Sequence, residues 1–155
     1  MLTDTLVTRT LGLLSPSIIA FLARHNDPSV YIKIIQMDQS GSDHKTLLTH
    51  WLFTSKDNTV ENPDYVMGAD GKARYTLRTG NCSRESALDG AHLVLPGDVI
   101  WAGCVNWNGL VVSVSGAADA MVDEGIANMI AAAIIMECQA EVNELRKQDA
   151  WTRPE

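Results

Sequence analysis

The sequence predicts an α+β fold in which helices flank an antiparallel β-sheet, and three observations predict it. Asn108-Gly109 lies between two apolar runs and is typical of a two-residue type I′ hairpin turn, because both central residues of that turn need positive φ. Residues 30–37 (VYIKIIQM) are β-branched and aromatic, as strands are. Residues 118–148 repeat apolar side chains at intervals of three and four, which predicts a long C-terminal helix.

The composition is that of an ordinary globular protein. With 155 residues, 46% hydrophobic and 20% charged, the chain is expected to form a single domain over residues 1–155. A formal net charge of −7 argues against nucleic acid as a partner. The three cysteines are far apart and have no zinc-finger spacing, so we expect reduced thiols and no metal site.

The N-terminus predicts a cytoplasmic protein. Asp4 and Arg9 interrupt the first apolar stretch, unlike the core of a secretory signal. The most apolar run, residues 126–136, is too short to span a bilayer, so no membrane partner is expected.

Two short helices are expected before the first strand. Residues 2–14 have apolar positions that suit one helix, and Ser15-Pro16 is a start signal for another, since serine caps helices and proline suits their first position. Asn26-Asp27-Pro28 ends that second helix, because the residue before proline leaves the α region. Residues 38–43 form a turn after the strand.

Residues 56–97 are expected to contain the functional loops, and residues 44–55 form a regular element before them. Residues 44–55 have apolar residues at helical spacing, and we favour a helix, although a second hairpin strand would equally suit them. From residue 56 the chain is polar and turn-rich. A short hairpin is expected there, with strands at 65–67 and 73–78 over an Asp70-Gly71 turn, and a helical turn follows at 83–88. Loops of this length commonly carry function or become ordered only on assembly.

The hairpin turn fixes which residues share a face, because side chains alternate across a strand. One face is large and apolar apart from two glycines, and we expect it to meet the core; its pairs are Trp107–Leu110, Val105–Val112, Gly103–Val114 and Trp101–Gly116. The other face is small and partly polar, and we expect it to line a shallow pocket or meet another layer; its pairs are Asn106–Val111, Cys104–Ser113 and Ala102–Ser115.

The long helix should begin after Asp119, a residue type that caps helices, with Asp123 and Glu124 at the positive end of the helix dipole. Its middle, residues 126–136, is apolar nearly all round. One side can pack on the sheet, and the other is expected to meet a second helix or a neighbouring subunit.

Residues 95–136 resemble the GlcG/HbpS-like family, also called heme-degrading or PduO C-terminal-like domains. The resemblance rests on Pro96-Gly97 before a strand, on Val114-Ser115-Gly116 after a hairpin, and on Asp123-Glu124-Gly125-Ile126-Ala127 opening the last helix. It implies a profilin-like layered fold, an antiparallel sheet with flanking helices and a long C-terminal helix, commonly assembled into oligomers. It also implies binding of tetrapyrroles or other small ligands. The Ala-rich second helix with a Lys-Ala pair that the family has is not predicted in residues 44–90.

The small hairpin face predicts ligand-binding roles for Cys104, Asn106, Ser113 and Ser115. A thiol becomes a nucleophile only beside a base or a positive field, and His92 is the candidate to supply one; the alternative for Cys104 is a buried structural thiol.

Lys72, Arg74, Arg78 and Arg84 form a basic cluster in this polar segment. Arg74 and Arg78 are the binding candidates among them, because arginine suits the carboxylates of an anionic ligand; the alternative is a solvated hairpin face.

Asp119, Asp123 and Glu124 suit helix capping and the helix dipole; the alternative is a carboxylate pair for acid–base chemistry or a cation site. His44 and His50 lie six positions apart, which is no chelating spacing, so no metal site is predicted. The alternative is that they converge in space with His25 and His92 as metal or heme ligands.

Three functions are compatible with these residues. The first is a homo-oligomeric protein of the GlcG/HbpS-like type that binds a small molecule, either a tetrapyrrole such as heme or an organic acid, with Arg74 or Arg78 orienting its anionic group. The second is a cofactor-independent enzyme acting on an organic acid through His92 or Cys104. The third is a non-catalytic assembly module whose interface is the long helix.

Overall fold

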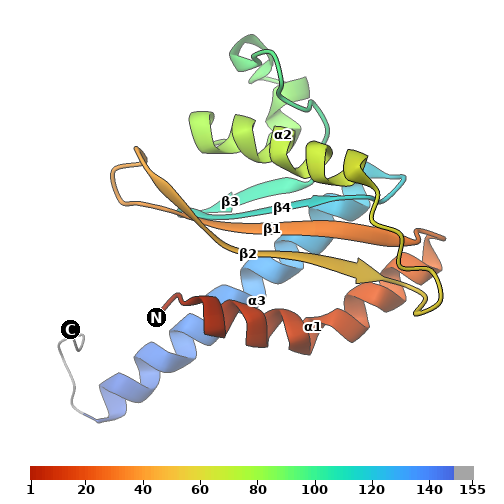
Figure 1. Ribbon diagram of the computed structural model, residues 1–155. Helices are drawn as coiled ribbons and strands as arrows, with labels where there is room; N and C mark the ends of the chain where they lie inside the picture. The colour runs from red at the N-terminus through yellow and green to blue at the C-terminus, as the bar shows by residue number, and fades with distance from the viewer. Residues whose placement is uncertain (149–155) are drawn as a thin grey trace.

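A computed structural model of the chain describes residues 1–148 and shows a three-layer α+β arrangement (Figure 1). Helices α1 and α3 cover one face of an antiparallel sheet, and α2 covers the other (Figure 1). The predicted α+β fold class is thereby confirmed. The elements in chain order are α1 (Asp4–Arg24), β1 (Ser29–Met37), β2 (His44–Phe53), α2 (Pro63–Thr79), the 3₁₀ turns η1 (Ser83–Ala87) and η2 (Ala91–Leu93), β3 (Cys104–Trp107), β4 (Leu110–Ser115) and α3 (Ala120–Lys147).

The β3–β4 hairpin has the predicted register. The strand order is β2-β1-β4-β3, and β3 pairs with β4 as Cys104–Ser113, Val105–Val112, Asn106–Val111 and Trp107–Leu110. Asn108 and Gly109 have φ of 51° and 91°, as a type I′ turn requires. The expectation that Trp101 packs in the core is wrong. The regular pairing begins at Cys104, and Trp101 precedes it with 63% of its surface exposed.

The two faces of the hairpin serve two different layers, as the alternation predicts. The large apolar face belongs to the main core between the sheet, α1 and α3, where Val105, Val112 and Val114 are at most 2% exposed. The small face lies under α2, and Cys104 and Val111 pack there with Ala73. The second layer therefore covers most of the face that was expected to line a pocket or meet another layer.

The N-terminal segment forms one helix, not two. Thr3 caps α1 by accepting a hydrogen bond from the Leu6 N–H, and the helix continues through Pro16. Proline removes one backbone donor, but Val7, Leu11, Ile18 and Leu22 form a stripe that is at most 2% exposed, and burial of this stripe on both sides of the proline keeps the helix intact.

By length and composition α1 is also apolar enough to cross a membrane, with a mean hydropathy of 1.6. In the folded chain its buried stripe packs within the core cluster that also holds the sheet and α3.

The favoured helix at residues 44–55 is wrong, and the segment is strand β2. The pairing of β1 with β2 shifts between Ile34 and Ile35, where Leu48 faces Ile34 and Thr46 faces Ile35. Leu47 is therefore the extra residue of a bulge. The bulge interrupts the alternation of inward and outward side chains along β2. Two leucines, Leu47 and Leu48, are adjacent there, and the segment has the apolar spacing of a helix.

The expected hairpin at residues 65–78 is also wrong, because residues 63–79 form α2. Asn62 caps this helix by accepting from the Asp64 N–H, Pro63 occupies its first turn, and Gly80 ends it with φ of 77°. Gly68 and Gly71 sit within the helix where it approaches the sheet and the 97–99 segment: a Cβ would lie 2.4 Å from Ser115 Oγ at the first and 2.4 Å from Val99 Cγ2 at the second.

Helix α2 also supplies the Lys-Ala pair that the family resemblance implied, as Lys72-Ala73. The helical turn expected at 83–88 is confirmed as η1, and α3 is confirmed with Asp119 as its N-cap, accepting from the Met121 N–H.

Candidate functional site

A cleft of about 730 Å³ opens between α2, the 99–102 segment and the beginning of α3. Its volume falls in the range of small-molecule sites, roughly 300–1,000 Å³. One wall is polar and comes from α2 and the end of β4, including Asp64, Lys72 and Ser115; the other is apolar and includes Val99, Trp101 and Met121.

A buried ion pair forms the floor of the cleft. Lys72 Nζ lies 3.0 Å from Asp123 Oδ2, and both side chains are 3% exposed. The ammonium also donates to the carbonyl of Val114 at 2.9 Å, and Asp123 Oδ1 accepts from the Ala117 N–H at 3.0 Å. Burial raises the pKa of the Asp123 carboxyl above 3.8, although attraction to Lys72 works in the opposite direction.

The ammonium of Lys72 has one more N–H group than it has acceptors among the described residues. An ammonium has three N–H groups, and only the Asp123 carboxylate and the Val114 carbonyl accept from it among residues 1–148. A ligand oxygen in the cleft would satisfy the third donor.

Two glycines make room for these polar groups. Gly103 has φ of 131°, and a Cβ there would lie 2.6 Å from Lys72 Nζ and 2.6 Å from the Val114 carbonyl oxygen. Gly68, one helical turn before Lys72, leaves similar room for the hydroxyl of Ser115. A side chain at either position would displace these groups.

The rim of the cleft combines apolar surface with carboxylates. Trp101 and Met121 are 63% and 52% exposed, and both are large apolar side chains that line the same hollow. Asp64 and Asp119 are exposed beside them, and each takes part in the start of a helix. The rim therefore offers a flat apolar contact bordered by negative charge.

Of the hairpin residues predicted to bind ligand, the structure places Ser115 in the cleft. Cys104 and Ser113 are completely buried beneath α2, and the Ser113 hydroxyl donates to the Ala69 carbonyl at 2.7 Å. Burial raises the pKa of the Cys104 thiol to about 11. The thiol is thus protonated at neutral pH, which disfavours it as a nucleophile.

The remaining predicted site residues take part in structural contacts or lie on the surface. Asn106 joins β3 to the end of α2, donating to the Gly80 carbonyl at 3.0 Å and accepting from the Gly109 N–H at 2.9 Å. Arg78 donates to both Asp98 oxygens and to the Leu93 carbonyl, so it fastens the 93–98 loop to α2.

Arg74 is exposed beside Gly97, where a Cβ would lie 2.1 Å from Arg74 Nη1, and His92 is exposed on η2. No group of three metal-ligating side chains gathers anywhere in residues 1–148.

The basic cluster predicted from the sequence includes Lys72, but the predicted site residues do not, and capping is the favoured role there for Asp123. The sequence did contain a signal. Lys72 follows Gly68 by four positions, so the two share a helix face, and Gly71 is its neighbour. Glycines in a helix indicate that another part of the chain approaches the helix closely. The assignment of this segment to a hairpin concealed that spacing.

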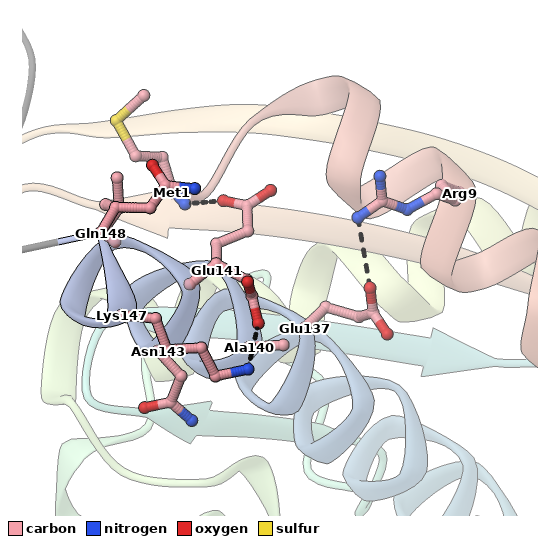
Figure 2. Close-up of a pocket in the computed structure, with 10 residues that line it drawn as sticks. Met1, Arg9, Glu137, Ala140, Glu141, Asn143, Lys147 and Gln148 are labelled. Carbon is pink, nitrogen blue, oxygen red and sulfur yellow. Dashed lines mark hydrogen bonds and ion pairs between the residues drawn. The ribbon is translucent and has the colours of Figure 1, made fainter.

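A second hollow, of about 870 Å³, lies between the N-terminus of α1 and the last turns of α3 (Figure 2). Figure 2 shows its charged side chains joined in pairs: Arg9 with Glu137 at 3.2 Å, and the Met1 ammonium with Glu141. These groups are largely solvent-exposed and neutralise each other. The hollow therefore lacks the buried, partly unsatisfied polar group that distinguishes the first cleft.

Comparison with known proteins establishes the fold. No protein-family model and no curated protein matches the sequence. Among solved structures, a double mutant of Streptomyces reticuli HbpS is similar with a TM-score of 0.56 and 21% identity, over 85% of this chain and 86% of that one. Klebsiella pneumoniae protein ORFY has a TM-score of 0.54 and 16% identity, over 86% and 90%. PduOC, solved in complex with heme, has a TM-score of 0.52 and 16% identity, over 81% and 91%. The GlcG/HbpS-like resemblance of residues 95–136 thus extends, as a fold, over most of the chain.

Proposed function

We propose that the protein is an oligomeric small-ligand-binding protein of the GlcG/HbpS-like type, and that the Lys72–Asp123 cleft is its site. The observation that carries the proposal is the buried ammonium with one unclaimed donor at the floor of a ligand-sized hollow. A buried donor without an acceptor is costly, and a ligand oxygen removes that cost.

The ligand class follows from the two walls. Lys72 and the Ser115 hydroxyl suit one carboxylate or carbonyl oxygen, whereas Trp101 and Met121 suit a flat apolar body. A tetrapyrrole such as heme, with a carboxylate on an apolar ring system, and a small organic acid both meet this description. The similarity of fold to PduOC, which was solved with heme, favours testing heme first.

The cleft suits one of the heme carboxylates and disfavours a second. One carboxylate can meet Lys72, while Asp64 and Asp119 at the rim would repel a second one that approached them. Within the cleft, Lys72 and Ser115 would hold the carboxylate and Trp101 would stack on the ring. Bound heme would supply an iron centre, and Lys72, Ser115 and Trp101 would position the heme in the cleft.

The test is a heme titration followed by absorbance in the Soret region, with the full chain and two tryptophan variants. Trp101→Ala should weaken binding by about tenfold or more, as the loss of an aromatic anchor does. Trp107→Ala, at the hairpin and 39% exposed, is the matched control and should bind as the wild type does.

Each result has a definite meaning. If micromolar heme produces no Soret change, the tetrapyrrole version is withdrawn, and a thermal-shift panel of small carboxylic acids tests the organic-acid version. If Trp101→Ala binds heme as tightly as the wild type does, the ligand site does not lie in this cleft.

A further inference from the structure

The outward face of α3 carries a seam that the other described elements leave largely uncovered, with Asn128 in contact with Trp107 of β3 at its edge. The seam residues lie alternately four and three positions apart, at 121, 125, 128, 132, 135, 139, 142 and 146. All of them are exposed or half-buried, and three are large and apolar: Met121, Ile135 and Val142 are 52%, 38% and 43% exposed. The core side of the helix is a different set, which includes Ile126, Ile130 and Ile134 at no more than 2%.

This spacing has a specific structural meaning. An apolar or small residue every 3.5 positions is the repeat by which two helices pack along their whole length with a left-handed twist. The solvent face of a helix in a soluble protein ordinarily carries charged residues. Between Met121 and Val142, the seam of α3 carries none.

We propose that a second copy of this chain covers the seam, with the two α3 helices antiparallel about a two-fold axis that passes near Ala133 and Ile134, the midpoint of the 28-residue helix. An antiparallel pair centred there maps the seam onto itself. Gly125 then faces the partner's Val142, and Ala132 faces the partner's Ile135. Each small residue meets a large one, as close helix packing requires.

A polar pair sets the register. In the same arrangement Asn128 faces the partner's Gln139. The Asn128 Oδ1 already accepts from Trp107 Nε1 at 3.1 Å, so its amide N–H groups are the ones free to donate to the glutamine oxygen. An amide pair within an otherwise apolar seam penalises every other register, in which these groups would face apolar side chains.

The two ends of the helix are complementary in charge. The first turn of α3 is acidic and its last turn contains Arg146 and Lys147. Antiparallel pairing places Asp119 near the partner's Lys147 and opposes the two helix dipoles favourably. Figure 1 shows the last turns of α3 extending past the sheet. These features favour a second copy over an unrelated partner, because every seam residue finds its complement on the same helix.

The pairing also bears on the cleft. Met121 lines the cleft. In the proposed antiparallel arrangement Met121 faces the partner's Arg146. The partner thus brings a guanidinium to the mouth of a site whose own rim is acidic. This last point rests on the proposed function; the pairing itself does not, and its test needs no ligand.

The test is sedimentation velocity on the full chain at micromolar concentration. The wild type should sediment as a dimer or a multiple of it, and Ile135→Glu should sediment as a monomer with an unchanged circular-dichroism spectrum. Leu13→Glu, at an apolar position of α1 that is 70% exposed, is the control and should leave the assembly intact. A monomeric wild type overturns the proposal, as does an Ile135→Glu variant that remains assembled.

The relative orientation of the two α3 helices is tested by replacing the Asn128–Gln139 amide pair with charged residues. These variants also test the pairing if Ile135→Glu fails to fold. Gln139→Lys alone should raise the dimer dissociation constant by about tenfold, because it opposes an ammonium to an amide within the interface. Adding Asn128→Asp should restore it, since antiparallel pairing brings the new carboxylate of one copy to the new ammonium of the other. In a parallel dimer the double variant would set like charges together, and weaker assembly than in the single variant would refute the antiparallel register.

Discussion

Lys72 and Asp123 are 51 positions apart in the sequence, yet their charged atoms lie 3.0 Å apart in the interior. The pair connects α2, on one face of the sheet, to α3, on the other, and the Val114 carbonyl at the end of β4 completes the connection. It is therefore both a structural tie between layers and the floor of the candidate ligand site.

Breaking this pair from one side should be strongly destabilising. Lys72→Met leaves the Asp123 carboxylate buried without its countercharge, and we expect the free energy of unfolding to fall by about 3–5 kcal/mol. Replacing both partners, Lys72→Met with Asp123→Leu, should recover part of that loss. Urea denaturation measures both. Lys33→Met, which breaks a more exposed pair with Asp70, is the control and should cost about 1 kcal/mol or less. A Lys72→Met loss no larger than the control's would contradict the assignment.

The Arg78–Asp98 ion pair should make stability depend on pH in a predictable direction. The hydrogen bond from Arg78 holds the pKa of the Asp98 carboxyl below its usual value of 3.8. The folded state thus binds the proton less tightly than the unfolded state does. The stabilisation is fully present above pH 3.8 and is lost as the pH falls through the lower, folded-state pKa.

The comparison that shows this is urea denaturation of the wild type and Asp98→Asn, from neutral pH to below pH 3.8. The wild type should be the more stable of the two at neutral pH, and the difference should shrink on acidification. A difference that stays constant across this range would mean that the pair does not titrate as inferred.

The Cys104 thiol should be unreactive in the folded protein. Its pKa is raised to about 11 by burial, and the side chain is completely covered. Alkylation with iodoacetamide, followed by peptide mass spectrometry, should leave Cys104 unmodified under native conditions and label it in urea. The half-buried Cys82 provides an internal comparison and should be labelled earlier. Rapid native labelling of Cys104 would revive the nucleophile hypothesis.

Local signals predicted the elements whose physical causes are themselves local. The Asn108-Gly109 turn specified the β3–β4 register, and Asp119 marked the start of α3, because positive φ and capping involve only neighbouring residues. Alternation within the hairpin then separated the face under α1 and α3 from the face under α2.

Errors arose where long-range packing overrides local pattern. The bulge at Leu47 gave β2 a helical spacing, and only its pairing with β1 decides the matter. In α2, two glycines lower the helix propensity, but close contact with Ser115 and Val99 requires them. Pro16 suggested a boundary, and the buried stripe of α1 continues past it.

The sequence by itself determined the α+β class, the hairpin with its two chemically different faces, and the long C-terminal helix, since each depends on turn chemistry and periodicity within one segment. Only the tertiary structure decided the site. The cleft depends on a lysine from α2, an aspartate from α3 and a tryptophan before β3, and no local rule relates side chains so far apart in the chain. Burial of one charge is tolerated only beside its partner, and folding is what brings the two together.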